Sequence, residues 1–443
     1  MDQDLTKKEN NEEDLPLVLI VDDDEIFQQF LINRLKEENM IVKCETAMNV
    51  SEAVNLIEEQ IKKEQNFDIV FLDMYLKDNT YGLDLLKIIR DNDWLKEAAI
   101  VVMSGTEDSN IVEKCYNFRI QNFLKKPISK MSFKNELIKL KKTLKEKTCP
   151  FKDYKYLKYL GEGALGKVYL VRNIISKEKY AMRTIRIEDC RREYENSGHL
   201  QMLNLPTVVK IKQVNIISGY ISYIIMEYSE VGALSNLIKS YAMKKEYIPD
   251  NMIINWMTHI LIGLYQIHEM GYLHRDIRSE KIFLFKNSIA KLKELDSFKI
   301  LGEYNREENI IRPSYYMPPE VILNKNYSNL TDIWSTGVVF FELLTNTLPF
   351  KGTYSEETNK KIVNVDYNID LIPKTRNPEL ITLLKKMLTL NPEDRWKAID
   401  CLQFKLINER LHKLLEEKAF EINDDVKSKL MNIKPKLENY KNV

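Results

Sequence analysis

The chain has 443 residues, and its 66 basic residues balance 66 acidic ones, so the formal net charge at pH 7 is zero. That balance argues against nucleic acid or an anionic membrane surface as the main partner, because both favour a basic chain. Hydrophobic residues make up 44% and charged residues 30%, which is typical of soluble globular proteins, and the length suffices for two or three domains.

The five cysteines are scattered and form no C-x-x-C pair, which predicts neither a disulfide framework nor a zinc site and favours a reducing compartment. Residues 1–15 are polar and mostly acidic, and we expect a disordered tail there. This tail lacks the apolar core of a signal peptide, and no run in the chain approaches the roughly 18 apolar residues of a membrane-spanning helix. We therefore predict a cytoplasmic protein with no membrane segment.

Residues 16–147 alternate short apolar runs with helical patterns. Four runs end on polar side chains: "PLVLIVDDD" (16–24), "FDIVFLDM" (67–74), "AIVVMSG" (99–105) and "NFLKKP" (122–127). Apolar residues recur at helical spacing between these runs and again over 131–147. The alternation predicts an α/β domain with a doubly wound parallel sheet.

The polar residues at the strand ends form a constellation that we expect to meet in one crevice, because functional residues of open α/β sheets gather at the carboxyl ends of the strands. Several carboxylates in one crevice repel each other unless a cation joins them, and Mg²⁺ prefers such oxygen ligands. One carboxylate can then act as a nucleophile toward phosphorus. The residues are Asp22, Asp23, Asp73, Ser104 and Lys126.

With this order and spacing, residues 16–147 resemble the receiver domain of response regulators, which has a flavodoxin-like fold with a five-stranded parallel sheet. The resemblance implies that Asp73 accepts a phosphoryl group from a histidine kinase or a histidine phosphotransfer protein. It assigns the remaining roles as follows: Asp22, Asp23, Asp73 and the main-chain carbonyl of Tyr75 bind Mg²⁺, Ser104 binds a phosphoryl oxygen, Lys126 neutralises its charge, and Phe123 turns inward when Ser104 moves.

Residues 148–153 contain a proline and are predicted to link this domain to a second one over 154–408, which a helical and then polar tail follows at 409–443. The second domain carries a series of motifs in a fixed order: "GEGALGKV" (161–168), "KYAMRTI" (179–185), "YIIMEYSEVGALSNLI" (223–238), "HRDIRSEKIF" (274–283), "YYMPPE" (315–320), "TDIWSTGVVFFELL" (331–344) and "NPEDRW" (391–396).

These motifs resemble a eukaryotic-type protein kinase domain, a two-lobed α+β fold. The resemblance implies a buried ion pair between Glu320 and Arg395, and it makes Asp332 the residue that braces the catalytic loop. Its nucleotide-binding positions are Gly161, Gly163 and Gly166 over the phosphates, Val168, Ala181 and Phe283 around the adenine, Met226 as gatekeeper, and Glu227 and Tyr228 in the hinge.

The positions that carry the chemistry of a kinase depart from the family pattern. Asp276 is present as the candidate base, but Arg183 replaces the lysine that pairs with the nucleotide phosphates. Lys281 stands where the pattern H-R-D-x-K-x-x-N has its magnesium-binding asparagine. Glu294 replaces the metal-binding aspartate of the family's D-F-G motif. Phosphoryl transfer depends on charge neutralisation by metal, so these changes predict an impaired enzyme. The partner of Arg183 is open between Glu193, Glu195 and Asn196.

The sequence thus predicts a phosphorelay protein whose receiver controls a pseudokinase that binds ATP, with a metal-independent mode of binding. Two alternatives stay open. The second domain could be an active ATP-dependent Ser/Thr kinase, or the receiver could be degenerate and serve dimerisation alone. We expect Tyr304, Ser314, Tyr315 and Tyr316 to be packing residues, with phosphorylation beside Arg275 as the alternative.

Overall fold

The computed structural model describes residues 15–76, 82–105, 108–146, 149, 151, 153–163, 166–186, 205–217, 221–293, 299–300, 314–323, 327–417, 420 and 422–436. Contacts divide the chain into two compact units, one comprising Met1–Arg186 with Asn215–Ile225 and the other Ile187–Val214 with Met226–Val443. Among the described residues, no helix combines the length and apolar character that crossing a lipid bilayer requires.

The N-terminal domain contains a five-stranded sheet in the order β2-β1-β3-β4-β5, with every neighbouring pair parallel. The strands are β1 (Leu17–Val21), β2 (Lys43–Ala47), β3 (Ile69–Asp73), β4 (Ala99–Ser104) and β5 (Asn122–Lys125). Every residue of the three central strands is buried, as expected for a parallel sheet that is covered on both faces. The predicted doubly wound fold is confirmed.

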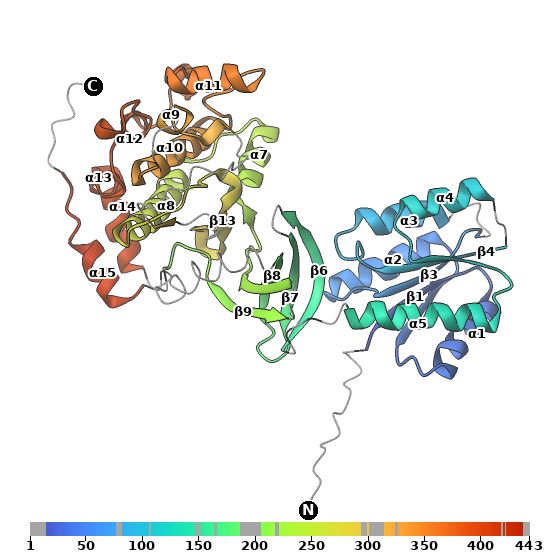
Figure 1. The fold of residues 1–443 in the computed structure, drawn as a ribbon. Coiled ribbons are helices and arrows are strands. Elements are labelled where there is room, and N and C mark those ends of the chain that lie inside the picture. Colours follow the sequence, from blue (N-terminus) through green and yellow to red (C-terminus); the bar gives the residue numbers. More distant parts are fainter. Residues whose placement is uncertain are drawn as a thin grey trace, which may run out of the picture. The chain divides into compact units, whose positions relative to one another are not determined.

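Helices pack on both faces of this sheet (Figure 1). Leu31 and Leu35 of one helix and Leu137 of another share a core with alternate strand residues on one face, while Ile57 and Leu86 belong to the core of the opposite face. The helices are α1 (Glu25–Glu37) and α5 (Lys130–Glu146) on the first face, and α2 (Val50–Lys62), α3 (Gly82–Asp91) and α4 (Ser109–Asn117) on the second.

A second five-stranded sheet has the order β6-β7-β8-β10-β9, with antiparallel pairing between its first three strands. These strands are β6 (Tyr154–Gly163), β7 (Gly166–Asn173), β8 (Lys179–Arg186), β9 (Ile211–Ile217) and β10 (Ile221–Glu227). Aromatic and β-branched residues recur along them, with three tyrosines in β6 and two valines and a tyrosine in β7, as is typical of strands.

The C-terminal part is mainly helical, and its largest helices are buried nearly all round. Helix α8 (Asp250–Glu269) and helix α10 (Asn329–Thr345) supply Trp256 and Trp334 to the core. The other α-helices among the described residues of this part are α7 (Leu234–Lys244), α9 (Pro319–Ile322), α11 (Ser355–Val363), α12 (Pro378–Met387), α13 (Ala398–Gln403), α14 (Lys405–Glu416) and α15 (Asp424–Met431). The short strands are β11 (Gly232–Ala233), β12 (Tyr272–Leu273), β13 (Ile282–Phe285), β14 (Ile289–Leu292) and β15 (Lys299–Ile300).

The segment after residue 408 contributes to this core. Phe420, Leu430 and Ile433 are buried in the same cluster as Trp256 and Trp334. The Asn408 amide donates to the main-chain oxygens of Leu402 and Ile433, at 3.0 and 2.9 Å. The described part of the tail is therefore packed on the helical part of the kinase-like fold.

Candidate functional site

Three carboxylates meet at the carboxyl ends of β1 and β3, which are neighbours in the sheet. One side-chain oxygen each from Asp22, Asp23 and Asp73 lies within 4.8 Å of the others. Asp22 is fully buried and Asp73 is 7% exposed. The next acid, Asp24, serves a different purpose, because its carboxylate accepts hydrogen bonds from the main chain of Ile26 and Phe27 and caps α1.

Lys126, directly after β5, bridges two of these acids. Its ammonium donates to Asp22 Oδ2 and to Asp73 Oδ2, both at 2.7 Å, and it lies 4.2 Å from the centroid of the Phe27 ring. Burial raises the pKa of the Asp22 carboxyl, against the lowering effect of its hydrogen bond with Lys126. Burial alone would lower the pKa of Lys126, but its hydrogen bonds to Asp22 and Asp73 outweigh that effect and raise it. The lysine therefore stays cationic at neutral pH.

The charges of this pocket fit a divalent cation. Three carboxylates and one ammonium leave two negative charges when all are ionised, and carboxylate oxygens are the ligands that Mg²⁺ prefers. The ligand set predicted from the sequence also includes the main-chain carbonyl of Tyr75. Its N–H faces Asp73 Oδ1 at 3.5 Å, while its side chain is 44% exposed.

Two further predicted residues lie on the adjoining strands. Ser104 ends β4 and is fully buried, and its main-chain oxygen accepts a hydrogen bond from the N–H of Lys126 at 2.7 Å. Phe123 is half-buried on β5 and packs against one face of the sheet core. The structure thus brings Asp22, Asp23, Asp73, Ser104 and Lys126 to the carboxyl ends of the strands, while Phe123 lies further back, opposite Val102.

The sequence reasoning missed Gln28. Its buried amide donates to the main-chain oxygens of Asp22 at 2.6 Å and of Ala47 at 3.0 Å. It therefore links the residue that follows β1 to the last residue of β2. A polar residue three positions before Leu31, on the apolar side of a predicted helix, was the available signal.

In the C-terminal domain, Asp332 holds the catalytic loop as predicted. Its carboxylate accepts hydrogen bonds from the main-chain N–H groups of His274 at 2.8 Å and Arg275 at 2.7 Å. Burial alone would raise the pKa of Asp332, but its hydrogen bond with His268 and the nearby donors outweigh burial and lower it. The loop that carries Asp276 is therefore held by an ionised carboxylate.

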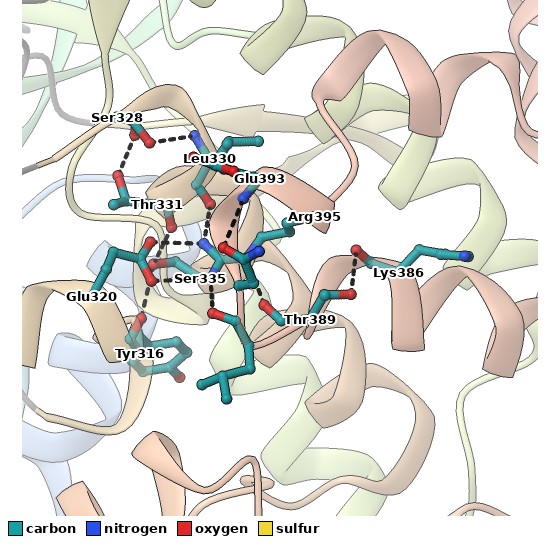
Figure 2. Close-up of polar contacts among 12 residues, drawn as sticks. Tyr316, Glu320, Ser328, Leu330, Thr331, Ser335, Lys386, Thr389, Glu393 and Arg395 are labelled. Carbon is teal, nitrogen blue, oxygen red and sulfur yellow. Dashed lines mark hydrogen bonds and ion pairs between the residues drawn. The ribbon is translucent and has the colours of Figure 1, made fainter.

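The predicted buried ion pair is also present (Figure 2). Arg395 donates to both carboxylate oxygens of Glu320, at 2.8 and 3.0 Å, and to the main-chain oxygen of Leu330 at 2.8 Å. Both charged side chains are almost completely buried. This bidentate pair joins α9, which contains Glu320, to the segment just before α13, which is far away in the sequence.

The catalytic loop contains two cations beside its candidate base. Arg278 Nε lies 3.4 Å from Asp276 Oδ1, and the ammonium of Lys281 lies 3.9 Å from Asp276 Oδ2. Arg278 stands at the lysine position of the pattern H-R-D-x-K-x-x-N, a second departure that the sequence reasoning missed although the motif contained it. An ammonium cannot coordinate a metal ion, so the described residues of this loop do not fit Mg²⁺ at the asparagine position.

The strand residues predicted to face the nucleotide share one face of the sheet. Val168 pairs with Arg183 and Leu170 with Ala181, and directly paired residues of antiparallel strands point to the same side. Arg183 is 4% exposed. A side chain at Gly166 would place its Cβ 2.0 Å from the main-chain oxygen of Thr184, so glycine is required there.

The remaining predicted nucleotide residues are distributed between the two units. Gly161 and Gly163 end β6, and Met226 and Glu227 end β10. Glu227, next to Tyr228, forms an ion pair with Lys291 at 2.6 Å, and Phe283 on β13 has the Lys293 ammonium 4.9 Å from its ring centroid. Glu294 and the three candidate partners of Arg183, which are Glu193, Glu195 and Asn196, lie outside the described residues.

Two of the three tyrosines predicted in the activation segment, Tyr315 and Tyr316, lie among the described residues. Tyr316 is buried, its hydroxyl donates to Glu342 Oε2 at 2.7 Å, and it lies 3.2 Å from Ser279 Oγ. Tyr315 packs against the helical core. These contacts agree with the expected packing role, while Tyr304 lies outside the described residues.

The fold and the two constellations define a receiver domain joined to a protein kinase domain, and comparison with protein families gives the same result. The protein kinase domain model matches residues 154–407, which is more than half of the chain, and the chain belongs to that family. The response regulator receiver domain model matches residues 18–138.

Curated relatives of this chain are named serine/threonine-protein kinases. Serine/threonine-protein kinase Nek3 of Mus musculus is 32% identical over 253 residues, 56% of this chain and 48% of that protein. Serine/threonine-protein kinase Nek5 of Homo sapiens is 30% identical over 251 residues, 55% of this chain and 34% of that protein. A probable serine/threonine-protein kinase of Dictyostelium discoideum is 27% identical over 338 residues, 66% and 70% respectively. The chain spans about half or less of the two Nek kinases.

Proposed function

We propose that this chain is a phosphorelay signalling protein in which phosphorylation of Asp73 controls a catalytically impaired kinase domain. The observation that carries the first half is the ammonium of Lys126 shared between Asp22 and Asp73 at 2.7 Å. This arrangement places a fixed positive charge beside the proposed acceptor carboxylate. A cation there favours the approach of a phosphoryl group with its negative oxygens.

The proposed reaction moves a phosphoryl group from a phosphohistidine to Asp73. A carboxylate oxygen of Asp73 forms a bond to phosphorus while the phosphorus–nitrogen bond breaks, and the histidine nitrogen keeps the electron pair. Lys126 and the Ser104 hydroxyl bind the phosphoryl oxygens. Mg²⁺, when bound by Asp22, Asp23, Asp73 and the main-chain carbonyl of Tyr75, would offset the charge that builds up on those oxygens.

Magnesium-dependent labelling tests this half of the proposal. The full chain, treated with radiolabelled acetyl phosphate and Mg²⁺, should incorporate label, and the Asp73→Asn variant and the EDTA-treated chain should not. Equal labelling of the Asp73→Asn variant would disprove the assignment of Asp73. Absence of labelling in the native chain, together with a dimer that Asp73→Asn leaves unchanged, would favour the alternative of a receiver used only for dimerisation.

The proposal that the kinase domain is a pseudokinase is supported by the positions of Lys281 and Arg278. Their cationic side chains lie beside the carboxylate of Asp276, where an active kinase would bind a metal ion. ATP is the proposed ligand, bound without a divalent ion, and the output would be a change in partner binding. The second candidate function is an active Ser/Thr kinase. It is favoured by the relatives named serine/threonine-protein kinases and by the retained Asp276.

Phosphate incorporation from labelled ATP separates these two functions. The full chain and its Asp276→Asn variant are incubated with labelled ATP and a general protein substrate, with Mg²⁺ and with Mn²⁺. The pseudokinase proposal expects no incorporation above that of the variant. Incorporation that disappears in Asp276→Asn would replace the proposal with a receiver-regulated kinase.

We propose a cytoplasmic location and a histidine kinase or histidine phosphotransfer protein as the phosphodonor. The four cysteines among the described residues are free thiols, which agrees with a reducing compartment. A pull-down of the phosphodonor with the Asp73→Asn chain as bait would test the partner class, since that variant retains the surface of the receiver.

A further inference from the structure

Strands β7 and β8, the second of which carries Arg183, direct their side chains alternately to two faces of the sheet. One face carries Val168, Ala181 and Arg183, the three residues predicted to face the nucleotide. The alternate pairs of the same two strands, Tyr169 with Met182 and Val171 with Tyr180, point to the opposite face because side chains alternate along a strand. Anything that displaces the second face must also move the backbone that positions Arg183.

Two described residues of the linker between the domains, Cys149 and Phe151, pack on this second face. Phe151 is 4% exposed, and its ring centroid lies 5.9 Å from that of Tyr154 and 6.4 Å from that of Tyr223, both in edge-on geometry. Cys149 Sγ lies 3.8 Å from the sulfur of Met182, the residue next to Arg183. Phe151 and Met182 belong to one hydrophobic cluster.

Main-chain hydrogen bonds fix the same segment to the sheet. The Phe151 oxygen accepts from the N–H of Tyr154 at 3.1 Å, and the Asp153 oxygen accepts from the N–H of Ile174 at 2.8 Å. The described residues of the linker are thus anchored parts of the kinase sheet, although the sequence alone predicted only a connection between two domains.

The receiver end of this linker is short. Helix α5 ends at Glu146, and Cys149 follows three residues later, so the two α-carbons cannot be more than about 11 Å apart. Leu137 of α5 belongs to the same buried core cluster as Met103 of β4 and Leu124 of β5. Those two residues adjoin Ser104 and Phe123, which are predicted to move on phosphorylation.

We propose that Cys149 and Phe151 mechanically couple the receiver to the kinase sheet, transmitting movement of α5 through their contacts to Met182 and thus to the strand of Arg183. The proposal rests on the proposed function, because it names the route by which phosphorylation of Asp73 reaches the second domain. It needs no ligand in the kinase domain.

Cys149 provides a native reporter for this route. The full chain is treated with iodoacetamide, with and without prior phosphorylation by acetyl phosphate and Mg²⁺, and alkylation of each cysteine is followed by peptide mass spectrometry. We expect the rate at Cys149 to change at least threefold on phosphorylation, and the rate at the buried Cys401 to stay constant. Hydrogen exchange of the peptide 179–186 should change in parallel.

Two variants make the test specific. Insertion of Gly-Ser-Gly-Ser between Lys147 and Thr148 should abolish both responses while Asp73 is still labelled, because a longer flexible linker no longer pulls on its anchor. The same insertion in the exposed turn after Lys245 should leave both responses intact. Asp73→Asn should abolish them in the native linker.

The proposal is overturned if the linker insertion keeps the full response, or if the labelled native chain shows no change at Cys149 and over 179–186. In either case labelling of Asp73 would still support the receiver chemistry. Absence of labelling would instead remove the proposed function, so the two failures are distinguishable.

Discussion

The ammonium of Lys281 lies 3.9 Å from Oδ2 of Asp276, at the position where the kinase pattern has a metal-binding asparagine. Arg278 Nε lies 3.4 Å from the other oxygen of the same carboxylate. The candidate base is thus paired with cations of the protein itself. In this position a lysine can supply positive charge to a phosphate chain without a divalent ion.

The first prediction concerns Lys281. In the native chain, the Kd for ATP should agree within about twofold between Mg²⁺ and EDTA, because a fixed ammonium supplies the positive charge. In Lys281→Asn, Mg²⁺ should tighten binding roughly tenfold, which is about 1.4 kcal/mol. Isothermal titration of the full chain measures both ratios. Lys286→Asn, at a side chain that is 79% exposed, is the control and should keep the native ratio. A native chain that needs Mg²⁺ to bind ATP would contradict this.

The second prediction concerns Lys126. Replacement by methionine leaves the carboxylates of Asp22 and Asp73 without their shared ammonium, and breaking a largely buried pair typically costs about 3 kcal/mol. We expect a lower melting temperature of the receiver in EDTA, with partial recovery in Mg²⁺. Differential scanning calorimetry of the full chain gives both values. Lys125→Met, at the exposed neighbouring position, should melt like the native chain. Equal melting of the two variants would show that the bridge does not stabilise the pocket.

The third prediction is a pH dependence from Glu342. Burial raises the pKa of its carboxyl from 4.5 to about 8, with the charge of Glu280 adding to the effect and the hydrogen bond with Tyr316 opposing it. The unfolded chain ionises this group first, so the free energy of unfolding should fall by about 1.4 kcal/mol per pH unit between 4.5 and 8 and then level off.

In Glu342→Gln this contribution disappears, so the melting temperatures of the native chain and the variant should diverge from pH 5 to pH 8 in favour of the variant. Thermal unfolding of both chains in matched buffers measures the divergence. Glu356→Gln, at an exposed position, should follow the native curve. Parallel curves for Glu342→Gln and the native chain would rule out the buried neutral acid.

The fourth prediction concerns Gly166. Alanine there would place its Cβ 2.0 Å from the main-chain oxygen of Thr184, on a backbone with φ of +143°. The β6–β7 connection must then shift, and we expect a loss of roughly 3 kcal/mol in the stability of this sheet. Hydrogen exchange of β7 and β8 reports the loss. The control is Gly105→Ala, where no atom lies within 4 Å of the added Cβ. Unchanged exchange in Gly166→Ala would show that the turn can adapt.

Most strands and helices of the receiver could be predicted from the sequence, because its central strands are continuously apolar and its helices have one apolar face. It gave no separate signal for β2, because this strand lies at the edge of the sheet and only Ala47 of its five residues is buried. Gln28 and Arg278 were overlooked for another reason. Gln28 belongs to a segment that was predicted from its helical spacing, and Arg278 belongs to a recognised motif. The role of a single polar side chain depends on the groups that it contacts in the folded chain, and the sequence does not show these contacts.

By itself, the sequence determined that acids follow two apolar runs, that a hydroxyl and a lysine follow two more, and that a lysine replaces a metal-binding asparagine in a kinase motif. These features are local, because apolar runs and motif spacing need no knowledge of distant residues. Only the tertiary structure decided that Lys126 joins Asp22 and Asp73 from 104 and 53 positions away, and that Cys149 touches Met182. Such contacts depend on strand order and packing, which no local pattern encodes.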